Sequence, residues 1–215
     1  MNFRPMRKLL IAISVLAMVL TACQKDKPYQ DNDTPQPVDP TYQIGDYFKN
    51  DTLEGIVFFT ISGGTHGLMV GLEETLLPWC IDTYINEETG ATNPYDGWNN
   101  TNILMANYDL HHYPVIQWSY NRNTWHSIHY EHRAIDAKQW YVPASNELRY
   151  LLQNQAAVNA TLDSLGYPNL EDKTYWSSTE TGTRGAAAVR LQNGQVVNGD
   201  SLKTLEYYVR AIRNF

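Results

Sequence analysis

Imidazole side chains gather in one stretch of the chain. His126, His129 and His132 recur at every third position, and Glu131 stands among them. Imidazole and carboxylate groups are common zinc ligands, so a structural or catalytic zinc site is one hypothesis. On a helix, however, the three histidines would spread over about 120° of its surface, and on a strand His129 would face away from the other two. The spacing therefore favours solvated loop histidines and keeps zinc as the alternative.

Other catalytic groups are sparse. Cys80 is the one cysteine besides Cys23, so the chain has no internal pair of thiols for redox chemistry. Ser177-Ser178 does not lie in the Gly-x-Ser-x-Gly pattern that presents a nucleophilic serine. The sequence therefore argues against an enzyme more than for one, and a metal-dependent hydrolase at the histidine-rich stretch is the enzymatic alternative.

Aromatic side chains are the stronger candidates for a binding role. The chain has six tryptophans and 15 tyrosines, and several fall in two stretches, 83–100 and 119–139, that are expected to be irregular. Exposed aromatic rings stack on sugar rings or anchor protein contacts, and loops present such residues on a rigid scaffold. We therefore predict a ligand surface built from these two stretches, unless the rings are buried. Its candidate contacts are Tyr95, Trp98, Tyr120 and Trp125.

The N-terminus has the features of a secretory signal peptide. A basic start precedes an apolar run over residues 9–20, about 12 residues, whereas a membrane span needs roughly 20. Leu20-Thr21-Ala22-Cys23 resembles the lipobox of bacterial lipoproteins, which implies cleavage before Cys23 and lipidation of its sulfur. We expect residues 1–22 to be a lipoprotein signal peptide and Cys23 to hold two or three acyl chains, enough for a stable membrane anchor. An ordinary signal peptide cut after Ala22 is the alternative.

Residues 23–41 are expected to form a flexible tether. They are rich in Pro, Asp, Gln and Asn and have little apolar surface to bury. Gln24-Lys25-Asp26 resembles the export signal that sends lipoproteins of the Bacteroidetes type to the cell surface. The expected location is therefore the outer membrane, lipid-anchored and surface-exposed.

The remaining chain, residues 42–215, is long enough for one well-buried domain. Once the basic residues of the signal peptide are removed, 13 basic residues stand against 23 acidic ones, a formal charge of −10. Such an acidic surface argues against nucleic acid as a partner. The membrane, through the lipid anchor, and a glycan or a surface protein remain as candidate partners.

Strand signals lie at both ends of this domain. Apolar runs at 56–61 and 67–72 flank the turn residues Ser62-Gly63-Gly64-Thr65 and predict a hairpin. Asn193-Gly194 predicts a second hairpin, and residues 205–215 predict a closing strand. Strands at both ends and helices between them predict the α+β class, with a mostly antiparallel sheet in which the terminal strands lie near each other.

Helices are expected in the middle of the chain. Residues 101–108 form one candidate, with Asn100 or Thr101 as the N-cap. A second begins at Pro114, a residue suited to the first helical position. A third and longer helix, 145–165, has apolar residues at helical spacing and should end at Gly166.

The start of the third helix holds the densest local pattern of the chain. If Glu147 is the third helical residue, the N-cap is Ala144, which has no side-chain oxygen, so only half of a capping box can form. If Ser145 is the N-cap instead, Glu147 is the second helical residue and contributes only through the helix dipole. These residues explain how a helix starts and require no catalysis. We expect Trp140, just before this start, and Trp176 to be core residues.

The same residues are part of a family resemblance. The segments WYVPASNEL (140–148), YWSST (175–179) and VRAIRNF (209–215) follow HGL (66–68) and DGWNNT (96–101) in the order of a widespread bacterial surface domain. From about Gly45 to Phe215 the chain resembles the C-terminal domain of the Legionella collagen-like adhesin and the major paralogous domain of Fibrobacter. The resemblance implies a C-type-lectin-like fold with two or three helices and long loops. That family has no agreed catalytic residues, so none is carried over.

Calcium is the other cofactor candidate, because many sugar-binding C-type lectins coordinate it. Trp98-Asn99-Asn100 is similar to their Trp-Asn-Asp motif, but the aspartate is missing and the chain has no Glu-Pro-Asn or Gln-Pro-Asp. Asp96-Gly97 is expected to form a turn. No cofactor is therefore expected, and calcium and zinc remain alternatives.

We interpret the sequence as a cell-surface lipoprotein with a lectin-like recognition domain that binds a glycan or a protein partner. A metal-dependent hydrolase and a purely structural subunit of a surface assembly are the alternatives. A metal with an open coordination position would favour the hydrolase, whereas a groove lined by exposed aromatic rings would favour recognition.

Overall fold

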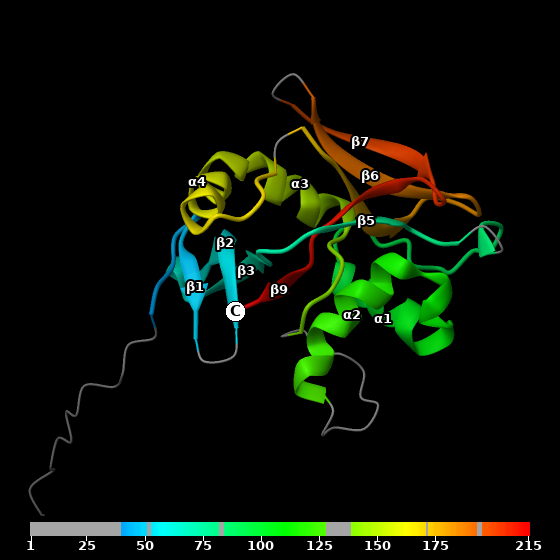
Figure 1. The fold of residues 1–215 in the computed structure, drawn as a ribbon, viewed down its shortest axis with the longest axis horizontal. Coiled ribbons are helices and arrows are strands. Elements are labelled where there is room, and N and C mark those ends of the chain that lie inside the picture. The colour runs from blue at the N-terminus through cyan, green and yellow to red at the C-terminus, as the bar shows by residue number, and fades with distance from the viewer. Residues whose placement is uncertain (1–39, 51–52, 82–83, 128–138, 171, 193–194) are drawn as a thin grey trace, which may run out of the picture. The chain divides into compact units, whose positions relative to one another are not determined.

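The computed structural model describes residues 40–50, 53–81, 84–127, 139–170, 172–192 and 195–215. Residues Asp39–Phe215 form one compact unit. Among the described residues, the helices and strands make two mostly antiparallel sheets and four α-helices (Figure 1). The predicted α+β class is thus confirmed, with one or two more helices than expected.

The smaller sheet unites the two ends of the domain. Its four strands lie in the order β1-β2-β3-β9 and are all antiparallel; they are β1 (Tyr47–Lys49), β2 (Glu54–Ile61), β3 (His66–Val70) and β9 (Ile212–Asn214). The predicted hairpin is β2–β3, joined through the short helix η1 (Ser62–Gly64). Gly64 has a φ of 93°, and a Cβ there would lie 2.4 Å from the carbonyl oxygen of Tyr42. The closing strand predicted over residues 205–215 is divided in two: β8 (Glu206–Val209) belongs to the larger sheet, and β9 lies beside this hairpin, so the two ends of the domain are near each other as expected.

The larger sheet has five strands in the order β4-β8-β5-β6-β7. They are β4 (Thr75–Pro78), β5 (Thr174–Glu180), β6 (Gly185–Gln192), β7 (Gln195–Leu202) and β8 (Glu206–Val209), and only β5 and β8 run parallel. Gln192 pairs with Gln195, so β6 and β7 form the second predicted hairpin, whose two connecting residues lie outside the described ones.

Two of the helices begin at residues that the sequence marks. α1 (Gly97–Asn107) begins earlier than predicted, because Asp96 is the N-cap and its Oδ1 accepts a hydrogen bond from the backbone N–H of Asn99. Asp96-Gly97 is therefore a helix start rather than a turn. α2 (Pro114–Ser127) begins at Pro114 as predicted, and the short helix η3 (Leu110–His112) precedes it.

The third predicted helix is divided into two. α3 (Ser145–Gln153) and α4 (Gln155–Leu165) meet at Asn154, whose side-chain Nδ2 donates to the carbonyl oxygens of Phe58 and Tyr150 at 3.2 and 3.0 Å. The bond to Phe58 ties the break to β2, 96 residues away in sequence. Gly166 ends α4 in the left-handed conformation that was predicted, with a φ of 76°.

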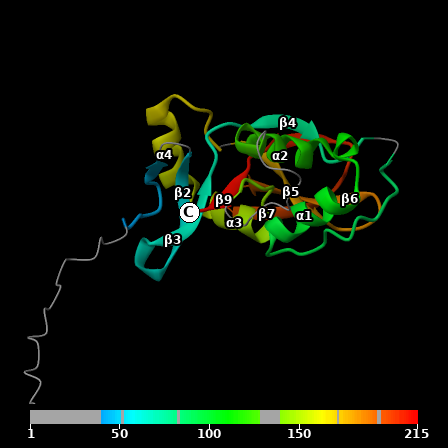
Figure 2. The same cartoon turned by 90° about the horizontal axis from the view of Figure 1, so that it is seen from below.

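The helices pack against the sheets in two pairs. α3 contacts β5, β6 and β7 as well as β2, and α4 contacts β2, so this pair links the two sheets (Figure 2). α1 packs against β5 and α2 against β4 (Figure 2). Trp176 is fully buried and its Nε1–H donates to the carbonyl oxygens of Leu77 and Leu205, while Trp140 is 6% exposed. Both tryptophans are core residues, as predicted.

Candidate functional site

A groove of about 680 Å³ lies where the smaller sheet meets the starts of α1 and α3. One wall is made by β2, β3 and the C-terminal residues, and the other by the segment before α1 and the start of α3. We call it the aromatic groove, because five of its lining residues are phenylalanine, tyrosine or tryptophan. It is lined by Phe59, Ile61, His66, Gly67, Leu68, Tyr95, Asp96, Trp98, Tyr141, Glu147, Asn214 and Phe215.

Glu147 joins the two helix starts at the base of this groove. Its Oε2 accepts hydrogen bonds from the backbone N–H of Ala144 at 2.7 Å and of Gly97 at 3.0 Å, and its Oε1 accepts from the hydroxyl of Tyr141 at 3.0 Å. The first bond is the half of a capping box that the sequence predicted. The second reaches the first residue of α1, 50 residues away. We call these three hydrogen bonds the Glu147 bridge.

Glycine is required at position 97 for this bridge to form. A Cβ there would lie 2.4 Å from both the backbone N of Ala144 and the carbonyl oxygen of Val142, and 2.6 Å from Oε2 of Glu147. Burial raises the pKa of Glu147 to about 7, against the lowering effect of the hydrogen bonds from Ala144, Tyr141 and Gly97. The carboxyl group is therefore close to its midpoint of ionisation at neutral pH.

The segment that presents Tyr95 is fixed to the domain by backbone and carboxamide bonds. Asn100, fully buried, accepts from the backbone N–H of Asn93 and donates to its carbonyl oxygen at 3.0 and 2.7 Å. Asn93 in turn accepts from the N–H of Tyr95 at 2.9 Å, and Asn146 of α3 donates to the carbonyl oxygen of Pro94. Tyr95 is nevertheless 69% exposed, so a rigid segment holds an aromatic ring in solvent.

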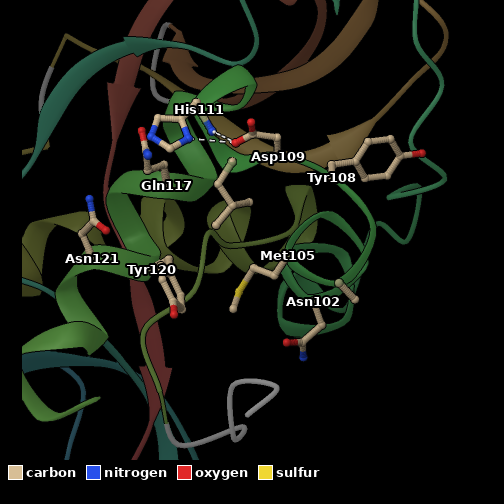
Figure 3. Close-up of a pocket in the computed structure, with 10 residues that line it drawn as sticks. Asn102, Met105, Tyr108, Asp109, His111, Gln117, Tyr120 and Asn121 are labelled. Atoms are coloured by element: carbon tan, nitrogen blue, oxygen red, sulfur yellow. Dashed lines mark hydrogen bonds and ion pairs between the residues drawn. The ribbon is translucent and has the colours of Figure 1, made fainter. Parts of the chain in front are cut away.

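A second hollow of about 630 Å³ lies between α1 and α2 (Figure 3). Figure 3 shows Tyr120 and Met105 facing the same space, with the carboxamides of Asn102 and Asn121 at its edges. The Oδ1 atom of Asn102 is buried and has no hydrogen-bond partner among the residues that the structure describes. We call this hollow the helix pocket.

The structure places three of the four predicted contacts, and these three lie in two different hollows. Tyr95 and partly buried Trp98 line the aromatic groove, whereas Tyr120 lines the helix pocket. Trp125 lies in α2, and its side chain is outside the described part of the structure. The expectation that both stretches are irregular is wrong in part, because residues 97–100 belong to α1 and residues 119–127 to α2.

The metal candidates lie mostly beyond the described residues. His126 is in α2 without a described side chain, and His129 and His132 fall in the gap at 128–138. Among the described residues, no three His, Cys, Asp or Glu side chains are grouped as metal ligands. In the segment that resembles a calcium motif, the Asn100 amide is engaged by Asn93 and by the Ser178 hydroxyl at 3.3 Å.

The sequence did not reveal the other lining residues of the groove. Glu147 was recognised as a helix-start residue, and its position in a half capping box was the one available signal. Phe59, Asn214 and Phe215 gave no signal of a binding role, because β2 and the C-terminal strand β9 come together only in the folded domain, where each pairs with β3.

The described strands and helices form an α+β fold, with the aromatic groove between the smaller sheet and the starts of α1 and α3. The family model named the Lcl C-terminal domain matches residues 74–213, so the chain belongs to that family, as the sequence motifs indicated. The match includes Tyr95, Trp98, Tyr141 and Glu147 but ends before Asn214 and begins after the β2–β3 hairpin.

A solved structure shares the fold. The crystal structure of a fimbrial protein from Bacteroides ovatus matches with a TM-score of 0.59 and 20% sequence identity, over 80% of this chain and 48% of that one. The present chain thus corresponds to about half of the fimbrial protein. A search of curated proteins gave no match. No described helix has the length and apolar character needed to span a membrane.

Proposed function

We propose that this protein is a lipid-anchored recognition protein of the outer cell surface, and that the aromatic groove is its ligand site. The observation that carries the proposal is Tyr95, a ring 69% exposed on a segment fixed by side-chain and backbone hydrogen bonds. A large apolar ring held in solvent by a rigid segment loses little conformational freedom when a ligand covers it.

The groove combines the features of a binding site. Aromatic rings of Tyr95, Trp98 and Phe59 supply surface on which a ligand can stack, and side chains of Asp96 and Asn214 supply polar contacts at its edges. The ligand is a glycan or a protein segment displayed outside the cell, in keeping with the surface class of the family.

The chemistry of the groove supports recognition rather than catalysis. Burial raises the pKa of Glu147 to about 7, but its hydrogen bonds go to two backbone amides and to Tyr141 within the chain itself. Asp96 is engaged as the N-cap of α1. Both carboxyl groups therefore serve to build the site, and neither is placed as an independent acid or base.

Anchoring at Cys23 would place this domain outside the cell on a tether of residues 23–41. Two or three acyl chains are sufficient for stable anchoring, whereas one is marginal. The acidic tether would remain solvated and would allow the groove to reach ligands away from the membrane.

The test is an array of surface glycans and extracellular proteins probed with the full chain, solubilised in detergent. Tyr95→Ala and Trp98→Ala should lose every ligand that the parent binds through the groove, while Tyr95→Ala keeps the parental unfolding midpoint. Tyr84→Ala is the matched control, because its ring stacks on His112 and does not line the groove. Ligands that survive both groove substitutions would place the binding site elsewhere.

A further inference from the structure

We propose that the ligand of the aromatic groove is a basic polypeptide segment, which inserts a lysine or arginine side chain between the aromatic rings and the carboxyl groups of Asp96 and Glu147. This inference rests on the proposed function of the groove and specifies the chemistry of its partner. It follows from the charges that line the groove and from the way this chain holds its own basic side chains.

The lining of the groove is acidic and aromatic. Asp96 and Glu147 contribute two carboxyl groups beside the rings of Tyr95, Trp98 and Tyr141, and none of the described lining residues is a lysine or an arginine. The face of an aromatic ring attracts a cation, and a neighbouring carboxylate adds to that attraction. A cationic group is therefore the ligand chemistry that the lining favours most.

The domain already uses the same combination to hold basic side chains of its own. Lys203 Nζ lies 4.9 Å from the ring centre of Trp79 and 2.5 Å from Oε1 of Glu180. Arg122 lies 5.1 Å from the ring of Trp118 and makes a 2.8 Å ion pair with Glu73.

A third example involves Lys173, which lies 5.0 Å from the ring centre of Tyr208 and pairs with Glu74. In all three sites an aromatic ring and a carboxylate hold a cation; Arg122 also lies over the ring of Trp140, and Glu74 also pairs with Arg210. The groove presents rings and carboxyl groups in the same combination at a surface open to solvent, and none of its described lining residues is a lysine or an arginine.

A polypeptide is the favoured source of this cation. Lysine and arginine place the charge at the end of a long apolar stem, which can lie along an aromatic wall while the charge reaches the carboxyl groups. The rim of the groove has aliphatic surface, since Ile61 is 52% exposed and Leu68 is partly buried. This rim suits apolar side chains next to the basic residue in a peptide, whereas a sugar ring would leave it uncovered.

A bound cation would also favour the ionised form of the Glu147 carboxyl group. Burial holds the pKa of Glu147 at about 7, with Asp96 and Tyr141 as its charged and titratable neighbours. Binding of a basic peptide should therefore strengthen as pH rises through 7, because the free groove is part-protonated below that pH. His66 also lines the groove, so a Glu147 variant is needed to isolate the contribution of Glu147.

The experiment is calorimetric titration of the full, detergent-solubilised chain with capped peptides of equal length. Their central residue is arginine, lysine, glutamine or glutamate, and aliphatic residues flank it. We expect the basic peptides to bind roughly tenfold more tightly than the glutamine peptide, and the glutamate peptide not to bind. Higher salt should weaken only the basic peptides.

Two variants that each remove one negative charge test the role of the carboxyl groups directly. Asp96→Asn keeps a good N-cap, and Glu147→Gln keeps an acceptor for the two backbone amides, so both should retain the fold. Each should weaken the basic peptides several-fold, and Glu147→Gln should also reduce the dependence of binding on pH. A glucosamine titration distinguishes a peptide from an amino sugar, and glucosamine is expected to bind weakly.

The outcomes separate this proposal from the proposed function. If array ligands bind in a Tyr95-dependent way while basic and glutamine peptides bind equally, the groove is a recognition site and the cationic ligand is refuted. Stronger binding of glucosamine than of the lysine peptide would also refute the polypeptide. If no array ligand or peptide depends on Tyr95, the groove itself is refuted as the ligand site.

Discussion

Replacement of Glu147 by alanine tests whether the Glu147 bridge holds the groove together. The substitution removes the acceptor for three donors: the backbone N–H groups of Ala144 and Gly97 and the hydroxyl of Tyr141. Ala144 is fully buried and Tyr141 is 2% exposed, so these donors have little access to bulk water. Glu147→Gln is the matched control, because its carbonyl oxygen can still accept from the two backbone amides while its NH₂ group faces the Tyr141 hydroxyl.

The expected cost follows from the three donors. A buried donor left without a partner costs about 1–3 kcal/mol, and the lower end applies here because the groove opens to solvent on one side. We therefore expect Glu147→Ala to lower the free energy of unfolding by about 3 kcal/mol at pH 5. Glu147→Gln should remain within about 1 kcal/mol of the parent at that pH, since it keeps the hydrogen bonds.

The difference between the parent and Glu147→Gln should also depend on pH. The folded-state pKa of Glu147 is raised from 4.5 to about 7, so the folded protein retains this proton longer than the unfolded chain does. The stability that comes from the neutral form is fully present below about pH 4.5 and is lost as pH rises through 7. The parent should therefore lose about 2–3 kcal/mol relative to Glu147→Gln between pH 5 and 8.

The assay is urea denaturation of the three proteins at pH 5 and 8, with free energies from linear extrapolation. Two results would refute the reasoning. If Glu147→Ala is as stable as the parent at pH 5, the bridge is not a structural element. If the parent and Glu147→Gln change in parallel with pH, the carboxyl group does not titrate near neutrality.

Three further predictions concern the anchor and the core. Cys23→Ala, expressed in the native cell, should release the protein from membranes, and a variant that still sediments with lipid would contradict anchoring at Cys23. Trp176→Ala and Trp140→Ala should each lower the free energy of unfolding by about 3–5 kcal/mol, and an unchanged denaturation midpoint for either would contradict its core role. Lys203→Met should cost about 3–5 kcal/mol in the same assay, because it leaves the buried carboxylate of Glu180 without its cation; adding Glu180→Gln should recover part of this loss, and no recovery would argue against the charge explanation.

Local chain chemistry determined much of the fold. Ser62-Gly63-Gly64-Thr65 predicted the β2–β3 hairpin, Pro114 the start of α2 and Gly166 the end of α4, and all three are found. These features are readable from sequence because each depends on backbone preferences and hydrogen bonds within a few residues. The order of short motifs was likewise enough to indicate the family that the comparison confirmed.

Local signals were insufficient where a distant residue decides the conformation. The apolar spacing of residues 145–165 predicted one helix, but Asn154 interrupts it while bonding to Phe58 of β2. The early start of α1 had a local signal in Asp96, yet the glycine after it favours a turn when judged alone. In the structure, the backbone N–H of Gly97 donates a hydrogen bond to Oε2 of Glu147, and this bond stabilises the helical conformation of the segment.

The candidate site was likewise predictable from the sequence only in part. The sequence by itself identified Tyr95 and Trp98 as aromatic residues in a segment suited to binding, and it placed Glu147 at a helix start. Only the tertiary structure brought them together with Phe59 and Asn214, because pairing of β9 with β3 places the C-terminus beside the N-terminal hairpin. Such pairing forms because strands that are far apart in sequence bury their apolar side chains in a common core. The alternation of apolar residues within one strand shows which face is buried, but it does not specify which distant strand will be its neighbour.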